Sequence, residues 1–184
     1  MRMTRVFAAA ALAIGIFAGA LGASAADTST WSRADAPTHA STRVFDSVFQ
    51  LHDGRVFVIG GEVCCPLDTL APPEIYDPRN GHWTDAATPS VPRRSAAAAQ
   101  LSDGRILIAG GYPPDCTADT CTGRVTAETK IYDPSTDSWN PAASLATARE
   151  AAAAVTLADG RILVAGGESI DSDYTQHLLA SAEL

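Results

Sequence analysis

Short apolar runs recur along the chain, and each one directly follows the tripeptide Asp-Gly-Arg. The runs occupy residues 56–59, 106–109 and 162–165, and none of them alternates between apolar and polar positions. A strand that is apolar on both faces is buried on both faces. Asp-Gly favours a tight turn, because glycine adopts positive φ at no steric cost. The pattern therefore predicts buried strands, each entered from a tight turn.

Further landmarks recur in a fixed order, which indicates a repeat protein. Each repeat has an Arg ten residues before the Asp-Gly turn and a Gly pair after the apolar run, and the first two repeats continue with Tyr-Asp-Pro and Trp. Proline removes a ladder donor, so Tyr-Asp-Pro is expected to end a strand. The landmarks are Arg43, Arg93 and Arg149, the pairs that begin at Gly60, Gly110 and Gly166, and the aromatic residues Tyr76, Tyr132, Trp83 and Trp139.

Alanine runs precede the second and third Asp-Gly turns, at residues 96–99 and 151–154. Alanine is a poor strand former, and the runs alone would favour a helix. We predict strands nevertheless, because each run leads directly into an Asp-Gly turn and a second strand. The first repeat differs here, with Phe45, Asp46 and Phe49. Small side chains suit innermost strands that crowd around a narrow axis.

The ordered set of Arg, Asp-Gly, Gly-Gly, Tyr and Trp closely resembles the kelch repeat, and the Asp-Gly-Arg and Tyr-Asp-Pro sequences resemble bacterial members of that family. The resemblance implies an all-β fold of kelch-type β-propeller blades, each a four-stranded antiparallel sheet. About three repeats are expected, at about residues 42–88, 93–144 and 149–184, with the third unfinished. Trp83 and Trp139 should lie on fourth strands and cover the interface with the next blade. Residues 27–31 resemble a stray fourth strand.

The N-terminal residues have the order of a secretory signal peptide. A basic start with Arg2 and Arg5 precedes an apolar run at residues 6–21, and Ala-Ser-Ala at residues 23–25 forms a small-residue cleavage pattern. The apolar run is shorter than the ~20 residues that a membrane span needs. We therefore expect residues 1–25 to be removed, residues 26–184 to be secreted or periplasmic, and no membrane anchor to remain.

The acidic charge argues against partners that bind basic surfaces. The net charge is -8, and removal of the signal peptide would take away Arg2 and Arg5 but no acid. Nucleic acids and anionic membranes are bound through basic patches. Neither is expected as a partner.

Three repeats are fewer than the roughly four to eight blades of a closed propeller. Three explanations are open: truncation relative to a longer six- or seven-bladed parent, a homodimer that completes a six-bladed ring, or an open arc with exposed apolar blade faces. Trp31 precedes Arg43 by 12 residues, and Trp83 precedes Arg93 by 10. The segment 27–31 is therefore a candidate to complete the last blade.

Strand alternation places the short turns on one face and the long variable loops on the other, where function is more often found. All the cysteines lie in these loops, and an even number in an exported chain predicts disulfide bonds. A zinc site is the weaker alternative, because the spacing is not Cys-x-x-Cys and the histidines show no ligand spacing. A local bridge, a vicinal bridge and pairing between the two loops all stay open for Cys64, Cys65, Cys116 and Cys121.

Arg43, Arg93 and Arg149 should begin the innermost strands, near the long-loop face. A ring of arginines at this place suits carboxylates or sulfated sugars, which guanidinium groups bind in a bidentate manner. The resemblance supports this role, since Arg at this motif position lines a ligand pocket in some kelch domains. The alternative is a structural role, with each Arg tied to Asp or to backbone carbonyls of adjacent loops.

The expected function is a non-catalytic binding module that presents its long-loop face to a protein or glycan ligand, by fold-level analogy. One alternative is a fragment of an enzyme that resembles galactose oxidase or sialic acid epimerases. Copper chemistry would need converging Tyr, His and Cys, and no His accompanies Tyr76 or Tyr132. Another alternative is a truncated, non-functional product. We predict no catalytic residue, metal site or cofactor.

Overall fold

The computed structural model describes residues 33–39, 43–63, 69–113, 123–173 and 175–184, apart from the side chains of residues 43–46, 62, 63 and 69. Every regular element in this part of the chain is a β-strand. The strands all belong to one compact unit, Ala34–Leu184. The signal peptide and the strand predicted at residues 27–31 lie outside the described residues.

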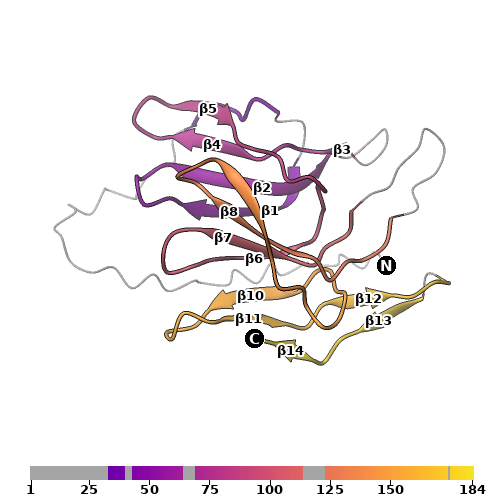
Figure 1. The fold of residues 1–184 in the computed structure, drawn as a ribbon. Coiled ribbons are helices and arrows are strands. Elements are labelled where there is room, and N and C mark those ends of the chain that lie inside the picture. The colour runs from indigo at the N-terminus through magenta and orange to yellow at the C-terminus, as the bar shows by residue number, and fades with distance from the viewer. Residues whose placement is uncertain (1–32, 40–42, 64–68, 114–122, 174) are drawn as a thin grey trace, which may run out of the picture. The chain divides into compact units, whose positions relative to one another are not determined.

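The strands form antiparallel sheets that follow one another along the chain (Figure 1). Blade 1 has the order β1-β2-β4-β5, blade 2 the order β6-β7-β8-β9, and the described strands of blade 3 the order β10-β11-β14. The bounds in blade 1 are β1 (Arg43–Gln50), β2 (Val56–Val63), β4 (Glu74–Asp77) and β5 (His82–Asp85). Those in blade 2 are β6 (Ala97–Gln100), β7 (Ile106–Ala109), β8 (Thr129–Asp133) and β9 (Ser138–Ala142). Those in blade 3 are β10 (Ala153–Thr156), β11 (Ile162–Ala165) and β14 (Ala182–Glu183).

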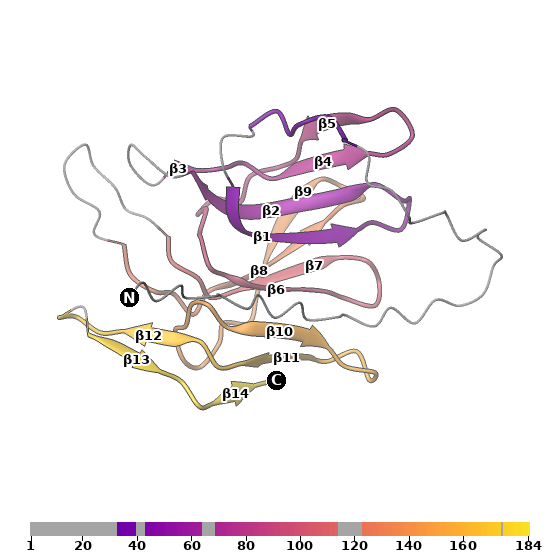
Figure 2. The same cartoon turned by 180° about the vertical axis from the view of Figure 1, so that it is seen from behind.

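Three short strands lie outside this scheme. β3 (Thr69–Leu70) pairs with β2, and β12 (Glu168–Ile170) pairs with β13 (Gln176–Leu178) to form a hairpin that extends beyond blade 3 (Figure 2). The prediction of all-β, four-stranded antiparallel blades is confirmed, including the alanine-rich strands β6 and β10.

Equivalent residues of the repeats pair in the same register. Tyr76 lies opposite Trp83 in blade 1, and Tyr132 lies opposite Trp139 in blade 2. The ring centroids are 5.0 Å and 5.1 Å apart in these two pairs. One sheet geometry therefore serves both repeats, and the repeat positions can be compared directly.

The interface between blades 1 and 2 is the main apolar core. Phe57 of β2 stacks on Tyr132 of β8, with ring centroids 4.4 Å apart, and both side chains are fully buried. Trp139 packs against the same core and donates a hydrogen bond from Nε1 to the carbonyl of Ala87, at 2.6 Å. The prediction that these tryptophans cover the interface with the next blade was wrong, because Trp139 covers the interface with the preceding blade. Trp139 lies opposite Tyr132 in the strand pair β8–β9, so both side chains lie on the face of blade 2 that meets blade 1.

The Gly pairs allow neighbouring blades to approach closely. A Cβ on Gly110 would lie 2.2 Å from the backbone oxygen of Arg149 in blade 3, and the amide of Gly111 donates to that oxygen at 2.8 Å. In blade 2 the pair follows the end of β7, as predicted. In blade 1, β2 continues through Gly60 and Gly61 to Val63, so there the pair does not end the strand.

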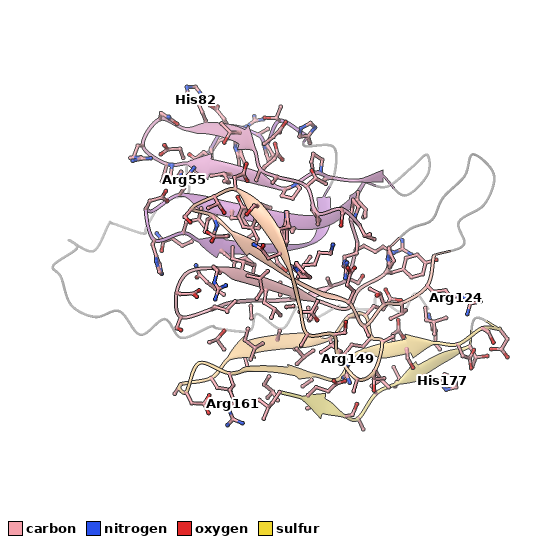
Figure 3. All side chains as sticks on the ribbon, viewed as in Figure 1. Arg55, His82, Arg124, Arg149, Arg161 and His177 are labelled. Carbon is pink, nitrogen blue, oxygen red and sulfur yellow. The ribbon has the colours of Figure 1, made fainter. Side chains whose placement is uncertain are left out.

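Two ends of the strands carry different connections (Figure 3). Arg55, His82 and Arg161 lie at the end with the Asp-Gly and Tyr-Asp-Pro turns, whereas Arg124 and His177 lie at the opposite end. This second end, the long-loop face, also carries the β12–β13 hairpin. The predicted division into a short-turn face and a long-loop face therefore holds among the described residues.

Candidate functional site

Arg93 and Arg149 are buried at the starts of blades 2 and 3, with 5% and 0% of their surface exposed. Arg149 donates to the carbonyls of Gly166 and Ser181 at 2.9 and 3.1 Å, and to the carboxylate of Glu183 at 2.7 Å. Arg93 donates to the carbonyls of Gly110 and Glu128 and pairs with the Glu128 carboxylate. Both guanidinium groups therefore tie the second and third strands of their own blade together. The side chain of Arg43 lies outside the described part, and a ligand-binding role for these arginines stays a prediction.

In blades 1 and 3, a glutamate on the third strand supports the loop before the innermost strand. Glu183 accepts hydrogen bonds from the amides of Ala146 and Thr147 at 2.6 and 3.1 Å. Glu74, at the equivalent position of blade 1, accepts from the amides of Thr38 and His39 at 2.7 and 3.2 Å. Lys130 takes this position in blade 2, and its ammonium group donates to the Ser90 hydroxyl instead. Glu128, two residues earlier, supplies the carboxylate that Arg93 requires.

His39, Glu74 and Asp85 bring possible metal ligands within 4.8 Å of one another. His39 Nε2 lies 2.9 Å from the Asp85 carboxylate. The Glu74 carboxylate, however, caps backbone amides as Glu183 does in blade 3, where no histidine takes part. We therefore interpret this group as part of the repeat architecture.

A second group of polar residues lies at the long-loop face. Two of its members directly follow a motif Arg, and the other two are their partners across the strand pair. Arg94 pairs with Tyr112 through an isolated antiparallel bridge, and the Arg94 guanidinium lies 4.7 Å from the centre of the Tyr112 ring. Glu150 pairs with Glu168 through the equivalent bridge of blade 3. We call these four residues the mouth cluster. It places a cation held on an aromatic ring beside two carboxylates.

Glu150 is the most unusual member of the mouth cluster. Only 8% of its surface is exposed, and its carboxylate lies near the charges of Arg94 and Glu168. Burial raises its pKa, and the charge of Glu168 raises it further, while Arg94 acts in the opposite direction. Directly opposed like charges destabilise a strand pair. A largely buried carboxylate opposite a second carboxylate would gain from an external hydrogen-bond donor.

The backbone beside the mouth cluster is strained. Ser95 and Ala151 follow the cluster residues of blades 2 and 3, and their φ angles are 53° and 52°. A positive φ in a residue other than glycine costs of order 1–3 kcal/mol and is concentrated at functional sites. The amide of Ala151 donates to the Ser95 carbonyl at 2.8 Å, which joins the two strained segments across the blade interface.

A small apolar cavity lies between blades 1 and 2. Its volume is about 100 Å³, enough for a few heavy atoms. Ser95 and Ala96 line it on one side, and the segment from Leu70 to Pro73 and the prolines Pro89 and Pro92 line it on the other. No member of the mouth cluster is among its lining residues, so the cavity is separate from the cluster.

On the short-turn face, the charged side chains of the Asp-Gly-Arg turns pair with each other. In each Asp-Gly-Arg turn the Arg donates from Nε to the Asp of its own turn, at 2.7 Å in Asp53–Arg55 and 2.8 Å in Asp159–Arg161. The side-chain hydrogen bond from Arg161 is the main cause of the lowered pKa of Asp159. These arginines close their own turns, which explains why the tripeptide recurs.

The mouth cluster was not identified from the sequence. Its members do follow a simple rule, since Arg94 and Glu150 directly follow a motif Arg, and Tyr112 and Glu168 directly follow a Gly pair. The predicted disulfide residues Cys64, Cys65, Cys116 and Cys121 lie outside the described residues, so their pairing stays a prediction.

Comparison with known proteins supports the fold. No family model matches the chain. The Kelch-like protein terF of Aspergillus terreus is 30% identical over 130 residues, which cover 70% of this chain and 26% of that protein. The Spermatocyte protein spe-26 of Caenorhabditis elegans is 28% identical over 88 residues, which cover 46% of this chain and 14% of that protein.

Solved structures give the same result. A fungal alcohol oxidase in complex with copper superposes with a TM-score of 0.57 at 20% identity, over 71% of this chain and 29% of that chain. YjhT superposes with a TM-score of 0.60 at 16% identity, over 78% of this chain and 42% of that chain. The chain has a kelch-type β-propeller fold. At these identities the structural likeness shows the fold alone, and the chain spans about a quarter or less of the curated relatives.

The described kelch-type blades contain no helix long and apolar enough to cross a membrane.

Proposed function

We propose that this chain is an exported kelch-type binding module, and that the mouth cluster on its long-loop face contacts a protein or glycan ligand. The observation that carries the proposal is Glu150, a largely buried carboxylate that lies opposite Glu168 in an isolated bridge. Like charges that face each other in a strand pair are destabilising. A bound ligand that donates hydrogen bonds to Glu150 would offset this cost.

The chemistry of the cluster favours a hydroxyl-rich ligand. Glu150 and Glu168 accept hydrogen bonds when ionised, and Arg94 carries guanidinium donors and lies over the Tyr112 ring. A sugar ring carries both hydroxyl donors and hydroxyl acceptors, so it satisfies both kinds of group. We therefore place glycans before protein segments.

Glu150→Gln tests this function. The purified chain is applied to an array of immobilised glycans and peptides, and the best ligand is titrated by calorimetry. An ionised acceptor contributes more than a neutral amide, so Glu150→Gln should weaken binding by roughly tenfold or more. Ligand affinity should rise as the pH rises through the raised pKa of Glu150, because hydroxyl donors prefer the ionised carboxylate, and the variant should lose this dependence.

Asp159→Asn is the matched control, since Asp159 lies in an Asp-Gly-Arg turn on the opposite face and is exposed. It should leave ligand affinity unchanged. Equal affinity of the wild-type chain and Glu150→Gln at all pH values, or a loss of affinity in Asp159→Asn, would argue against the mouth cluster as the binding site.

A further inference from the structure

The linkers that follow blades 1 and 2 differ at one position beside the blade interface. Pro89 in the first linker and Leu145 in the second each lie four residues before the motif Arg of the following blade. The amide of Leu145 donates a hydrogen bond to the Ala127 carbonyl at 2.9 Å. Ala71 has the position of Ala127 in blade 1, but proline has no N–H, so Pro89 cannot make this bond.

The same two positions also differ in the space that they fill. In the interface between blades 2 and 3, the Leu145 side chain packs against a buried apolar cluster. The cluster consists of Ala97, Ala109 and Val164. The residues at the same positions between blades 1 and 2 are Ser47, Ile59 and Ile108. All three line the cavity of about 100 Å³, and Pro89 lines it too. The cavity therefore takes the place that a leucine side chain occupies in the next interface.

The segments around this cavity resist collapse into it. Protein interiors are close-packed, so a space of this size persists only where its walls cannot move inward. Prolines make up much of the lining, and each has a fixed φ that limits the movement of its segment. They are Pro72, Pro73, Pro89 and Pro92. The amide of Ala86 also donates to the Pro73 carbonyl at 2.9 Å, which fastens the linker to blade 1.

We propose that this cavity binds a small branched aliphatic molecule whose apolar part has the size of a leucine side chain. Apolar cavities of roughly 150 Å³ bind benzene, so a volume of about 100 Å³ suits a smaller group such as isobutyl. Residues with hydroxyl groups, Ser47, Thr88 and Ser95, are also among the lining, and a few polar groups in an apolar wall are typical of ligand sites. A ligand with one hydroxyl group beside its apolar branch therefore matches the lining. This site is separate from the mouth cluster and does not rest on the function proposed for that cluster.

Isobutanol is the probe for this site, and ligand-observed NMR measures its binding to the purified chain. The wild-type chain should bind it weakly, in the millimolar range, as expected for so few apolar atoms. Ethylene glycol carries hydroxyl groups but no apolar branch, and it should not bind. Pro89→Leu introduces the residue of the next linker and should weaken isobutanol binding by roughly tenfold or more, because its side chain fills the cavity.

Pro89→Ala is the matched control, since it restores the same backbone N–H as Pro89→Leu but adds no side chain that fills the cavity. It should bind isobutanol at least as tightly as the wild-type chain. Pro89→Leu should unfold at a higher temperature than Pro89→Ala, because cavity filling stabilises a folded chain. Circular dichroism checks that both variants keep the fold.

Three results would overturn the proposal. The first is a wild-type chain that binds isobutanol no better than ethylene glycol. The second is an unchanged affinity in Pro89→Leu. The third is an equal loss in Pro89→Leu and Pro89→Ala, because these variants share the N–H and differ in side-chain volume. Glu150→Gln should leave isobutanol binding unchanged, so failure of this site and failure of the mouth cluster give different results.

Discussion

Tyr132→Ala should lower the free energy of unfolding by about 4 kcal/mol, within the range for loss of a large buried aromatic side chain. The Tyr132 ring is fully buried, stacks on Phe57 at 4.4 Å and packs beside Trp139. Its hydroxyl donates to Asp137 at 2.8 Å. Removal of the ring therefore opens a cavity in the interface between blades 1 and 2 and leaves Phe57 without its partner. Urea unfolding followed by circular dichroism measures the loss.

Two variants separate packing from polarity. Tyr132→Phe keeps the ring and should cost about 1 kcal/mol, the usual contribution of one hydrogen bond. Tyr76→Ala removes the equivalent residue of blade 1. Among the described residues its ring has a tilted contact with Trp83 and no stacked partner, so this variant should cost about half as much as Tyr132→Ala. Equal losses for the two alanine variants would contradict the packing difference between the blades.

Those two tyrosines also show what the sequence predicted and what it did not. The repeat assigned both to the ends of third strands, and the paired registers confirm that assignment. The side of the blade that Trp139 covers depends on how consecutive sheets stack, which no local pattern along the chain contains. The direction of stacking was therefore predicted wrongly, as was the end of β2, which continues past its Gly pair.

The candidate site was less predictable than the fold. The motif arginines were predicted to bind a ligand because they recur in every repeat. In the structure, Arg93 and Arg149 both donate hydrogen bonds to carbonyls of their own blade, so their recurrence reflects a shared structural role. The mouth cluster differs from blade to blade, with Arg94 in one and Glu150 in the next, so no repeat analysis singles it out. Its properties arise from burial and from the bridge partners across the strand pair, which appear only in the folded chain.

Arg149→Met should destabilise the chain by about 3 kcal/mol, the lower end of the range for breaking a buried ion pair. The Arg149 side chain is fully buried. Its loss removes the Arg149 hydrogen bond to the Gly166 carbonyl and one of the two hydrogen bonds to the Ser181 carbonyl, which keeps the Gly166 amide as a donor, and it leaves Glu183 without its countercharge. Arg149→Met combined with Glu183→Gln should recover part of the loss, because the uncompensated carboxylate is then absent. The same urea unfolding assay measures both variants, and Arg161→Met is the control. Arg161 is exposed and pairs only with the Asp of its own turn, so stability should remain nearly unchanged.

The pH dependence of stability distinguishes loss of the Arg149–Glu183 charge interaction from loss of packing alone. The amide of Ala146, opposed in part by burial and aided by the Thr147 amide and by Arg149, lowers the pKa of Glu183 in the folded chain. A lowered carboxyl pKa gives stability that is present above the unfolded value, about 4.3, and is lost as the pH falls through the folded pKa. Arg149→Met removes the contribution of Arg149 to the lowered Glu183 pKa but keeps the contribution of the two amides. The stability of the variant should therefore fall less than that of the wild-type chain between roughly pH 6 and pH 3, the span in which carboxylates protonate. If both proteins lose the same stability over that range, the Arg149–Glu183 pair contributes through packing rather than through charge. Arg149 would then hold the second and third strands of blade 3 together through the shape of its guanidinium group alone.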